Sequence, residues 1–580
     1  LLLALPLASS LSNFPIVTTS YGAVRGYEYR ARNGFTGEIF KKIPFASPPI
    51  GPRRWKKPIP PEKWNYTVDG TFFGPGCAQR SSFWKGYVTG FSEDCLNLNI
   101  YTSKECREST SLCPVVLYIH GGVALFDGTQ MFRDEELITN FASQGVIMVT
   151  VDYRLGVFGV MALGDENVLP ANLAVHDVLE ALRFTRQEIH NFGGDKDQIS
   201  IMGHSTGATM VQVMTFSPGI NKPGEPPLFA RAIAMSGEIL LETEERQVER
   251  SHRVARNLGC TGSAQEIVDC LLPLNTEAIL SVAFKTGGLN PFSKTQINDL
   301  TMAGELLPFT SARVLRENQK TTHIMFGSTL KEMDYYGFNG VDYKEDVRTN
   351  INRIFGIRNN EECMNKYFDD ERSGKFVPEY SGESQAMFLS NWILADAQTK
   401  AGGEAYLYQY DYPAHALHTD DVSYVMGFHD HPEDMNEKWL SHVFPIYFAN
   451  FIKGLPPAPD WKPFVPELMN YYSVNKSFAD GVSPETKEGY HRALNEYYAK
   501  MIEYDDNLTN IKKKFLNVPI QYKELIVLST EPVNIRDILF YSIILGIILF
   551  LVYKFYQCWR SRQRSGEESP LLIDRLNNNG

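Results

Sequence analysis

The sequence predicts an α/β fold built on a mostly parallel, doubly wound central sheet. Residues 114–119 (PVVLYI) and 146–151 (VIMVTV) are apolar and rich in β-branched side chains, the pattern of strands buried on both faces of such a sheet. Residues 175–189 carry apolar side chains at helical spacing, and this segment stops before Gly193 and Gly194. The alternation of strands and helices favours a sheet flanked by helices on both faces.

Further buried strands are expected along the rest of the chain. One ends near Met202, and others cover residues 232–235, 323–326 and 405–410. No internal repeat, low-complexity tract or long linker interrupts these elements before the C-terminal segment. We therefore expect one large domain over residues 11–530.

The composition is that of a folded globular chain with an acidic balance. Of the 580 residues, 43% are hydrophobic and 21% are charged, which excludes a largely disordered, collagen-like or coiled-coil protein. The 56 basic and 68 acidic side chains give a net charge of −12, so a nucleic-acid partner is not expected. The mean hydropathy of −0.24 excludes a polytopic membrane protein and allows a single span.

An oxidising compartment is indicated by the N-terminal segment and the cysteines. Residues 1–10 (LLLALPLASS) resemble the apolar part and cleavage site of a secretory signal, with a buried first strand as the alternative. The eight cysteines are then disulfide candidates. Their spacing leaves Cys363 and Cys558 over and suggests three local pairs: Cys77 with Cys95, Cys106 with Cys113, and Cys260 with Cys270. Sequons for N-glycosylation start at Asn65, Asn475 and Asn507.

A membrane span is predicted near the C-terminus. Residues 538–556 carry one charge, Lys554, and a helix of this length, about 28 Å, can cross a bilayer; a buried core helix is the alternative. Arginines follow at positions 560, 562 and 564, which indicates a cytosolic C-terminus. We expect a type I single-pass protein with a stalk (531–537), a transmembrane helix (538–556) and a cytosolic tail (557–580).

The predicted tail contains an acidic dileucine pattern. Glu567 precedes the pair Leu571 and Leu572 by four residues. We interpret this pattern as a sorting signal that a coat adaptor binds through a basic pocket and an apolar pocket, with a plain solvated tail as the alternative. The expected location is the plasma membrane or an endolysosomal membrane, with the large domain extracellular or lumenal.

The strongest chemical signal is a G-x-S-x-G motif at the end of one predicted strand. Residues 199–202 run into Gly203-His204-Ser205-Thr206-Gly207, and the residues that follow start as a helix would. In this context the glycines allow a strained turn that lifts the hydroxyl group of Ser205 above the sheet. The positive end of the following helix points at the site.

A second glycine-rich turn follows the predicted strand at 114–119. The residues His120-Gly121-Gly122-Val123 can direct backbone N–H groups at an oxyanion. The N–H groups of Gly122, Val123 and Thr206 would together form the oxyanion hole.

With these motifs the chain resembles the type-B carboxylesterase and cholinesterase-like family of α/β-hydrolases. The resemblance covers about residues 20–510 and implies an α/β-hydrolase fold. Three further segments match the family pattern in the expected order: Ile43 to Gly51, Glu93 to Tyr101, and Phe192 to Asp195.

The resemblance also implies a catalytic triad. Glu332 matches the acidic member, with Asp334 as the alternative. His418 matches the histidine, whereas His415 comes three residues too early. The chain order Ser205, Glu332, His418 is the order of α/β-hydrolases. In such a triad the imidazole removes the serine proton, and the carboxylate fixes the imidazole tautomer.

Several residues depart from the family's usual pattern. Val123 stands where the oxyanion turn usually has a third glycine, which costs conformational freedom. His204 and Thr206 stand where an acidic residue and an alanine usually flank the serine. We expect His204 to support the site from behind, with a secondary base role as the alternative. Trp84 lies near the position of the choline-stacking tryptophan of cholinesterases, and we expect it to be structural.

The resemblance implies a membrane-anchored serine carboxylesterase that hydrolyses small-molecule carboxylic esters through an acyl-serine intermediate. This chemistry needs no metal ion and no cofactor, and we expect neither. The missing acidic neighbour of Ser205 favours a broad carboxylesterase over a cholinesterase. The rival class is a catalytically weak or inactive adhesion receptor of the same topology. The presence of Ser205 and the short stalk argue against that class.

Overall fold

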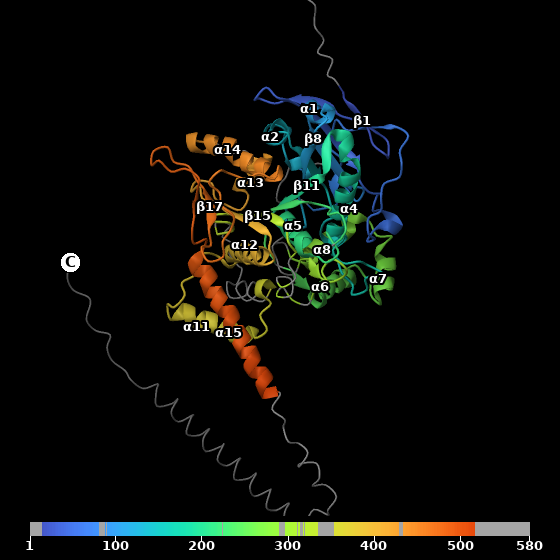
Figure 1. Cartoon of the computed structure of the whole chain (residues 1–580). Helices are drawn as coiled ribbons and strands as arrows, with labels where there is room; N and C mark the ends of the chain where they lie inside the picture. The colour runs from blue at the N-terminus through green and yellow to red at the C-terminus, as the bar shows by residue number, and fades with distance from the viewer. Residues whose placement is uncertain are drawn as a thin grey trace, which may run out of the picture. The chain divides into compact units, whose positions relative to one another are not determined.

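A mixed sheet of 11 strands organises the chain (Figure 1). The computed structural model describes residues 14–516, apart from 81–87, 89, 223, 240, 289–295, 310, 312, 314–316, 318–319, 335–352 and 429–432. In spatial order the strands are β18 (Glu485–Lys487), β17 (Tyr471–Val474), β16 (Glu404–Tyr410), β15 (His323–Thr329), β12 (Arg231–Met235), β11 (Gly194–His204), β9 (Cys113–Ile119), β10 (Ile147–Val151), β8 (Asn97–Thr102), β4 (Thr36–Pro44) and β3 (Tyr27–Arg30). The strands from β17 to β10 in this order are parallel, and antiparallel strands complete both edges.

Alternate residues of the central strands pack on opposite faces of the sheet. In β9, Leu117 belongs to one buried apolar cluster, whereas Val116 and Tyr118 belong to the other. In β12, Ala232 and Ile233 divide in the same way. Because both faces are buried, these strands have the continuously apolar sequences from which they were predicted.

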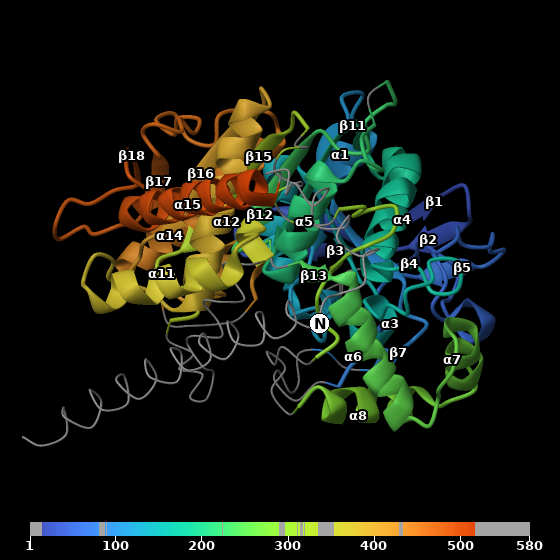
Figure 2. The ribbon, with the colours of Figure 1, turned by 90° about the horizontal axis from the view of Figure 1, so that it is seen from below.

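Helices cover both faces of this sheet (Figures 1 and 2). Helices α4 (Leu173–Glu188), α5 (Thr206–Phe216) and α12 (Gly382–Lys400) pack on one face. In Figure 2 this face is turned toward the viewer. Helices α2 (Asp134–Asn140), α13 (Asp420–Met426) and α14 (Met435–Ile452) pack on the other. The mostly parallel sheet flanked by helices confirms the α/β architecture that the sequence predicts.

The remaining described elements are mostly short or lie at the edges of these layers. The helices are η1 (Gly51–Arg53), α1 (Lys104–Glu108), η2 (Thr129–Met131), η3 (Ala142–Gln144), α3 (Gly156–Gly159), η4 (Ile189–Phe192), α6 (Glu244–Asn257), α7 (Ala264–Leu271), α8 (Thr276–Thr286), α11 (Asn360–Arg372) and α15 (Arg492–Leu516). Three small sheets contain β1 (Ile16–Thr18), β2 (Ala23–Arg25) and β5 (Thr67–Asp69); β6 (Gly76–Cys77) and β7 (Phe91–Ser92); and β13 (Glu242–Thr243) and β14 (Thr301–Met302).

Within the described residues, three disulfides join the cysteine pairs that the spacing suggests. The pairs are Cys77 with Cys95, Cys106 with Cys113, and Cys260 with Cys270. Cys363 is buried in α11 and takes part in none of these three bonds. Of the predicted glycosylation sites, Asn65 and Asn507 are exposed and Asn475 is half-buried.

Several predictions fall on residues that the structure does not describe. These are the signal segment, the domain boundaries at 10 and 530, the stalk, the transmembrane helix, the tail with its dileucine pattern, and Cys558. The chain divides into two compact units after Thr509, and the first of them holds the central sheet. Among the helices of the described ranges, none combines the length and the apolar character that a membrane span requires.

Candidate active site

The turn that carries Ser205 lies between β11 and α5, at the carboxyl end of the parallel strands. Ser205 adopts φ 56° and ψ −126°, a strained conformation for a residue other than glycine. The glycines on either side leave room that a side chain would fill. A Cβ atom on Gly207 would lie 2.1 Å from the carbonyl oxygen of Ile119, and one on Gly203 would lie 2.4 Å from the carbonyl carbon of Gly207. The close approach of β9 therefore requires glycine at position 207, and the tightness of the turn itself requires glycine at position 203.

Ser205, His418 and Glu332 form a continuous hydrogen-bonded relay at this turn. The Nε2 atom of His418 lies 2.9 Å from the hydroxyl oxygen of Ser205. The Nδ1 atom of His418 lies 2.6 Å from Oε2 of Glu332. Glu332 comes from the segment after β15, and His418 from the segment between β16 and α13. The structure thus brings together the three residues that the family pattern selects.

Backbone contacts hold the acidic and histidine segments side by side. Glu332 pairs with Leu417 in an isolated parallel bridge, and the N–H group of His418 donates to the carbonyl oxygen of Glu332 at 3.1 Å. The other carboxylate oxygen of Glu332, Oε1, accepts hydrogen bonds from the Ser236 hydroxyl group at 2.7 Å and the Thr329 N–H group at 2.8 Å. These contacts orient the carboxylate so that Oε2 faces the imidazole.

Two further residues at the site, Ser236 and Thr329, are not among those predicted from the sequence. Thr329 is the last residue of β15, and Ser236 directly follows β12. Both therefore lie at the carboxyl edge of the parallel sheet, where functional side chains of such folds gather. Ser236 directly follows the predicted strand 232–235, which is a signal for its position, whereas Thr329 lies three residues beyond the predicted strand 323–326.

The two alternative triad residues have other partners. His415 contacts the carboxylate of Glu437 through Nδ1. Asp334 accepts hydrogen bonds from the Ser381 N–H group at 2.7 Å and the Ser384 hydroxyl group at 2.8 Å. The geometry therefore favours His418 over His415 and Glu332 over Asp334.

Burial shifts the pKa values of the relay in opposite directions. Burial lowers the pKa of the His418 imidazole below its ordinary value, and the nearby carboxylate of Asp420 partly offsets this effect. Burial raises the pKa of the Glu332 carboxyl group, while hydrogen bonds from Ser236 and Thr329 favour its charged form. A lowered imidazole pKa keeps Nε2 of His418 unprotonated, which is the form that accepts a proton from Ser205.

The glycine-rich turn after β9 lies directly against Ser205. A Cβ atom on Gly121 would lie 2.9 Å from the Cβ atom of Ser205. Gly122 has φ 92° and Val123 has φ 46°. The left-handed conformation is strained for a β-branched residue such as valine. Within the described ranges, the N–H groups of Gly122, Val123 and Thr206 donate no hydrogen bond, so they are available to an oxyanion.

His204 contacts the backbone of His418. Its Nε2 atom lies 2.7 Å from the carbonyl oxygen of His418, and the two rings are 4.8 Å apart. This contact ties the His204 ring to the backbone of His418, and His204 also lines the cavity beside Ser205. Trp84, which the sequence analysis treats as structural, lies outside the described residues.

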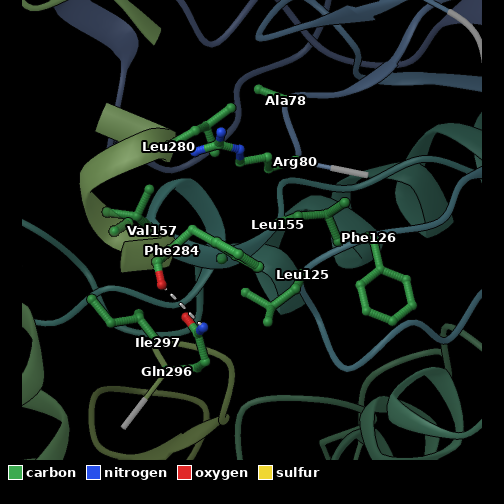
Figure 3. Close-up of a pocket in the computed structure, with 12 residues that line it drawn as sticks. Ala78, Arg80, Leu125, Phe126, Leu155, Val157, Leu280, Phe284, Gln296 and Ile297 are labelled. Atoms are coloured by element: carbon green, nitrogen blue, oxygen red, sulfur yellow. Dashed lines mark hydrogen bonds between the residues drawn. The ribbon is translucent and has the colours of Figure 1, made fainter. Parts of the chain in front are cut away.

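A cavity opens beside Ser205 and His418. Its lining includes the oxyanion turn and apolar side chains from several elements: Tyr118, Phe126, Phe132, Met333, Val422 and Phe428. Phe126 also lines a second cavity, together with Leu125, Leu155, Phe284 and Ile297 (Figure 3). The apolar side chains beside the nucleophile suit an apolar part of a substrate.

Comparisons with known proteins place this chain in a family. The model of the carboxylesterase family matches residues 13–493. A juvenile hormone esterase from Tribolium castaneum is 36% identical over 289 residues, which are 48% of this chain and 47% of that protein. Liver carboxylesterase 1 from Oryctolagus cuniculus is 28% identical over 516 residues, which are 77% of this chain and 88% of that protein.

The solved structures agree at the level of the fold. Juvenile hormone esterase from Manduca sexta has a TM-score of 0.73 at 21% identity, covering 85% of this chain and 100% of that one. The match to the Tribolium protein spans only about half of that relative's length. The chain belongs to the carboxylesterase family, and its fold is that of the α/β-hydrolases.

Proposed function

We propose that this protein is a serine esterase that hydrolyses carboxylic esters through an acyl intermediate on Ser205. The observation that carries the proposal is the relay from the Ser205 hydroxyl group through His418 to Glu332, with distances of 2.9 and 2.6 Å. Membership of the carboxylesterase family supports it, as do relatives named as carboxylesterases and juvenile hormone esterases.

The proposed mechanism assigns one task to each group. His418 takes the proton of Ser205 at Nε2 while the serine oxygen attacks the ester carbonyl carbon, and Glu332 stabilises the imidazolium that forms. The N–H groups of Gly122, Val123 and Thr206 stabilise the negative charge on the carbonyl oxygen. His418 returns the proton to the departing alcohol. A water molecule then attacks the acyl carbon while His418 takes its proton, and His418 gives that proton to the Ser205 oxygen as the acid leaves.

The proposed substrates are small-molecule esters with an apolar part. Phe132, Met333 and Phe428 line the cavity beside Ser205 and provide apolar surface for an acyl or alcohol group.

A membrane-anchored location is part of the same proposal. The apolar residues 538–556, the exposed sequon residues Asn65 and Asn507 and the disulfides support a type I protein with an extracellular or lumenal domain. An adaptor that binds the tail would keep surface levels low. Replacing Leu571 and Leu572 by alanine should then raise antibody labelling of unpermeabilised cells, and unchanged labelling would reject the sorting signal.

Turnover of a simple aryl ester tests the proposed activity. The purified full-length protein should hydrolyse 4-nitrophenyl butyrate, and Ser205→Ala should lower kcat by about 10⁴-fold or more, because only the serine oxygen can form the acyl intermediate. Equal rates for the wild-type protein and Ser205→Ala would reject the assignment. No turnover by the folded wild-type protein would favour the adhesion-receptor class.

A further inference from the structure

Asp127 lies in the cavity beside the proposed oxyanion hole. It lines the same cavity as Ser205 and His418. A Cβ atom on Gly122 would lie 2.9 Å from Cγ of Asp127, so the carboxyl group packs against the backbone of Gly122. A carboxyl group is thus placed next to an N–H group that is proposed to bind the substrate's carbonyl oxygen.

Within the described residues, no ion pair balances the charge of the Asp127 carboxyl group. Asp127 is 8% exposed, and its Oδ1 atom makes no hydrogen bond within the described part of the chain. Burial alone raises the pKa of this carboxyl group to about 7. Burial likewise raises the pKa of the neighbouring Asp152 to about 7, but the Asp152 carboxylate accepts hydrogen bonds from the N–H and hydroxyl groups of Thr129 at 2.9 and 2.8 Å. Burying an unpaired carboxylate costs free energy, so a positive charge that binds beside Asp127 would be stabilised.

The backbone of Asp127 is held in place by one side chain. Gln79 accepts a hydrogen bond from the Asp127 N–H group at 3.0 Å and donates one to the Asp127 carbonyl oxygen at 2.7 Å. Gln79 itself lies in the loop closed by Cys77 and Cys95. Asp127 has φ 81°, a left-handed conformation that aspartate and asparagine tolerate better than most residues. The two hydrogen bonds therefore fix the backbone of Asp127 at the wall of the cavity.

Aromatic rings surround the same cavity. Tyr118, Phe132 and Phe428 line it together with Asp127. The rings of Tyr118 and Phe132 meet edge to face at 5.0 Å, and those of Phe132 and Phe428 lie 6.4 Å apart. The faces of aromatic rings attract cations, and a carboxylate attracts them more strongly. This combination is the environment that recognises an organic ammonium group.

We propose that the cavity beside Ser205 contains a subsite for a protonated amine of the substrate, with Asp127 as its counter-charge. This inference rests on the proposed esterase function and narrows the substrate class to esters whose acyl or alcohol part carries such an amine. A lone carboxylate next to Gly122 opposes the negative charge that develops on the ester oxygen. The substrate's ammonium group cancels that repulsion. We therefore expect a higher kcat/KM for a cationic ester than for a neutral ester of the same shape.

A pair of isosteric esters tests the subsite. The substrate 2-(dimethylamino)ethyl butyrate is protonated at pH 7, and 3-methylbutyl butyrate has the same shape without the charge. The ratio of their kcat/KM values should fall about tenfold in Asp127→Asn, because one charge-assisted contact is lost. Asparagine keeps the size and the left-handed conformation, and the neutral ester reports whether the variant is folded. Asp152→Asn is the matched control and should leave the ratio unchanged, because Asp152 is paired with Thr129.

Equilibrium binding separates this inference from the proposed activity. In a Ser205→Ala background, calorimetry should show that Asp127→Asn weakens binding of the amino ester about tenfold relative to the neutral ester. Equal relative binding with and without Asp127, or equal kcat/KM ratios, would overturn the subsite. A wild-type protein that binds the amino ester selectively but hydrolyses neither ester would contradict the proposed esterase and support the subsite.

Discussion

The relay and the oxyanion turn lie on two sides of Ser205 and differ in how fully their polar groups are paired. On the side of the relay, each oxygen of the Glu332 carboxylate has a partner, one in His418 and the other in Ser236 and Thr329. On the side of the oxyanion turn, Val123 is strained. The carboxyl group of Asp127 on that side lacks a charge partner within the described residues. The hydrogen bonds of the relay are thus already formed, whereas the proposed subsite at Asp127 would gain its counter-charge from a bound substrate.

The largest effect is expected from a substitution in the relay. His418→Ala should lower kcat for 4-nitrophenyl butyrate by about 10⁴-fold, because no base remains within reach of the Ser205 hydroxyl group. His415→Ala is the matched control and should be mild, since His415 contacts Glu437 instead. The reverse ranking would move the base three residues along the chain.

Removing the charge of the acidic member should have the next largest effect. Glu332→Gln should lower kcat by about 10³-fold to 10⁴-fold, because the amide neither stabilises the imidazolium nor fixes the productive tautomer. Asp334→Asn should be far milder, since Asp334 accepts its hydrogen bonds from Ser381 and Ser384. Comparable losses in the two variants would leave the orienting role unassigned.

The pH profile should show the lowered pKa of His418. An imidazolium cannot accept the serine proton, so kcat/KM should fall as the pH drops through the pKa of this imidazole. Because burial lowers that pKa, the midpoint of the acid limb should lie below about 6.5, the ordinary imidazole value. Asp420→Asn removes a charge that raises the pKa and should move the limb to still lower pH. A midpoint above neutrality would contradict the burial argument.

The smallest effect is expected from a substitution of Val123 in the oxyanion turn. Val123→Gly should maintain kcat or raise it by about threefold at most, because glycine adopts φ 46° without the strain of a β-branched side chain. The measurement is kcat for 4-nitrophenyl butyrate, with the thermal midpoint as a check on folding. A large loss of activity in a folded variant would show that the valine side chain forms part of the acyl-binding wall.

The same contrast separates what the sequence can predict from what it cannot. Ser205, His418 and Glu332 lie in local motifs with a fixed chain order, and apolar periodicity predicts the strands that carry them. Ser236 and Glu332 are 96 residues apart in the chain, and they meet only because β12 lies beside β15 in the sheet. The isolation of Asp127 depends on which side chains surround it in space, and no motif contains that information. Strain at Val123 could be expected from its residue type, but its φ angle required the structure.

Covalent labelling tests the central claim most directly. A fluorophosphonate probe reacts with a serine only when a neighbouring base activates it and nearby donors hold the phosphoryl oxygen. Peptide mass spectrometry of the labelled, folded full-length protein should find one adduct, on Ser205, and Ser205→Ala should remain unlabelled. An adduct on another residue, or no adduct on folded wild-type protein, would contradict the assignment of Ser205 as the nucleophile.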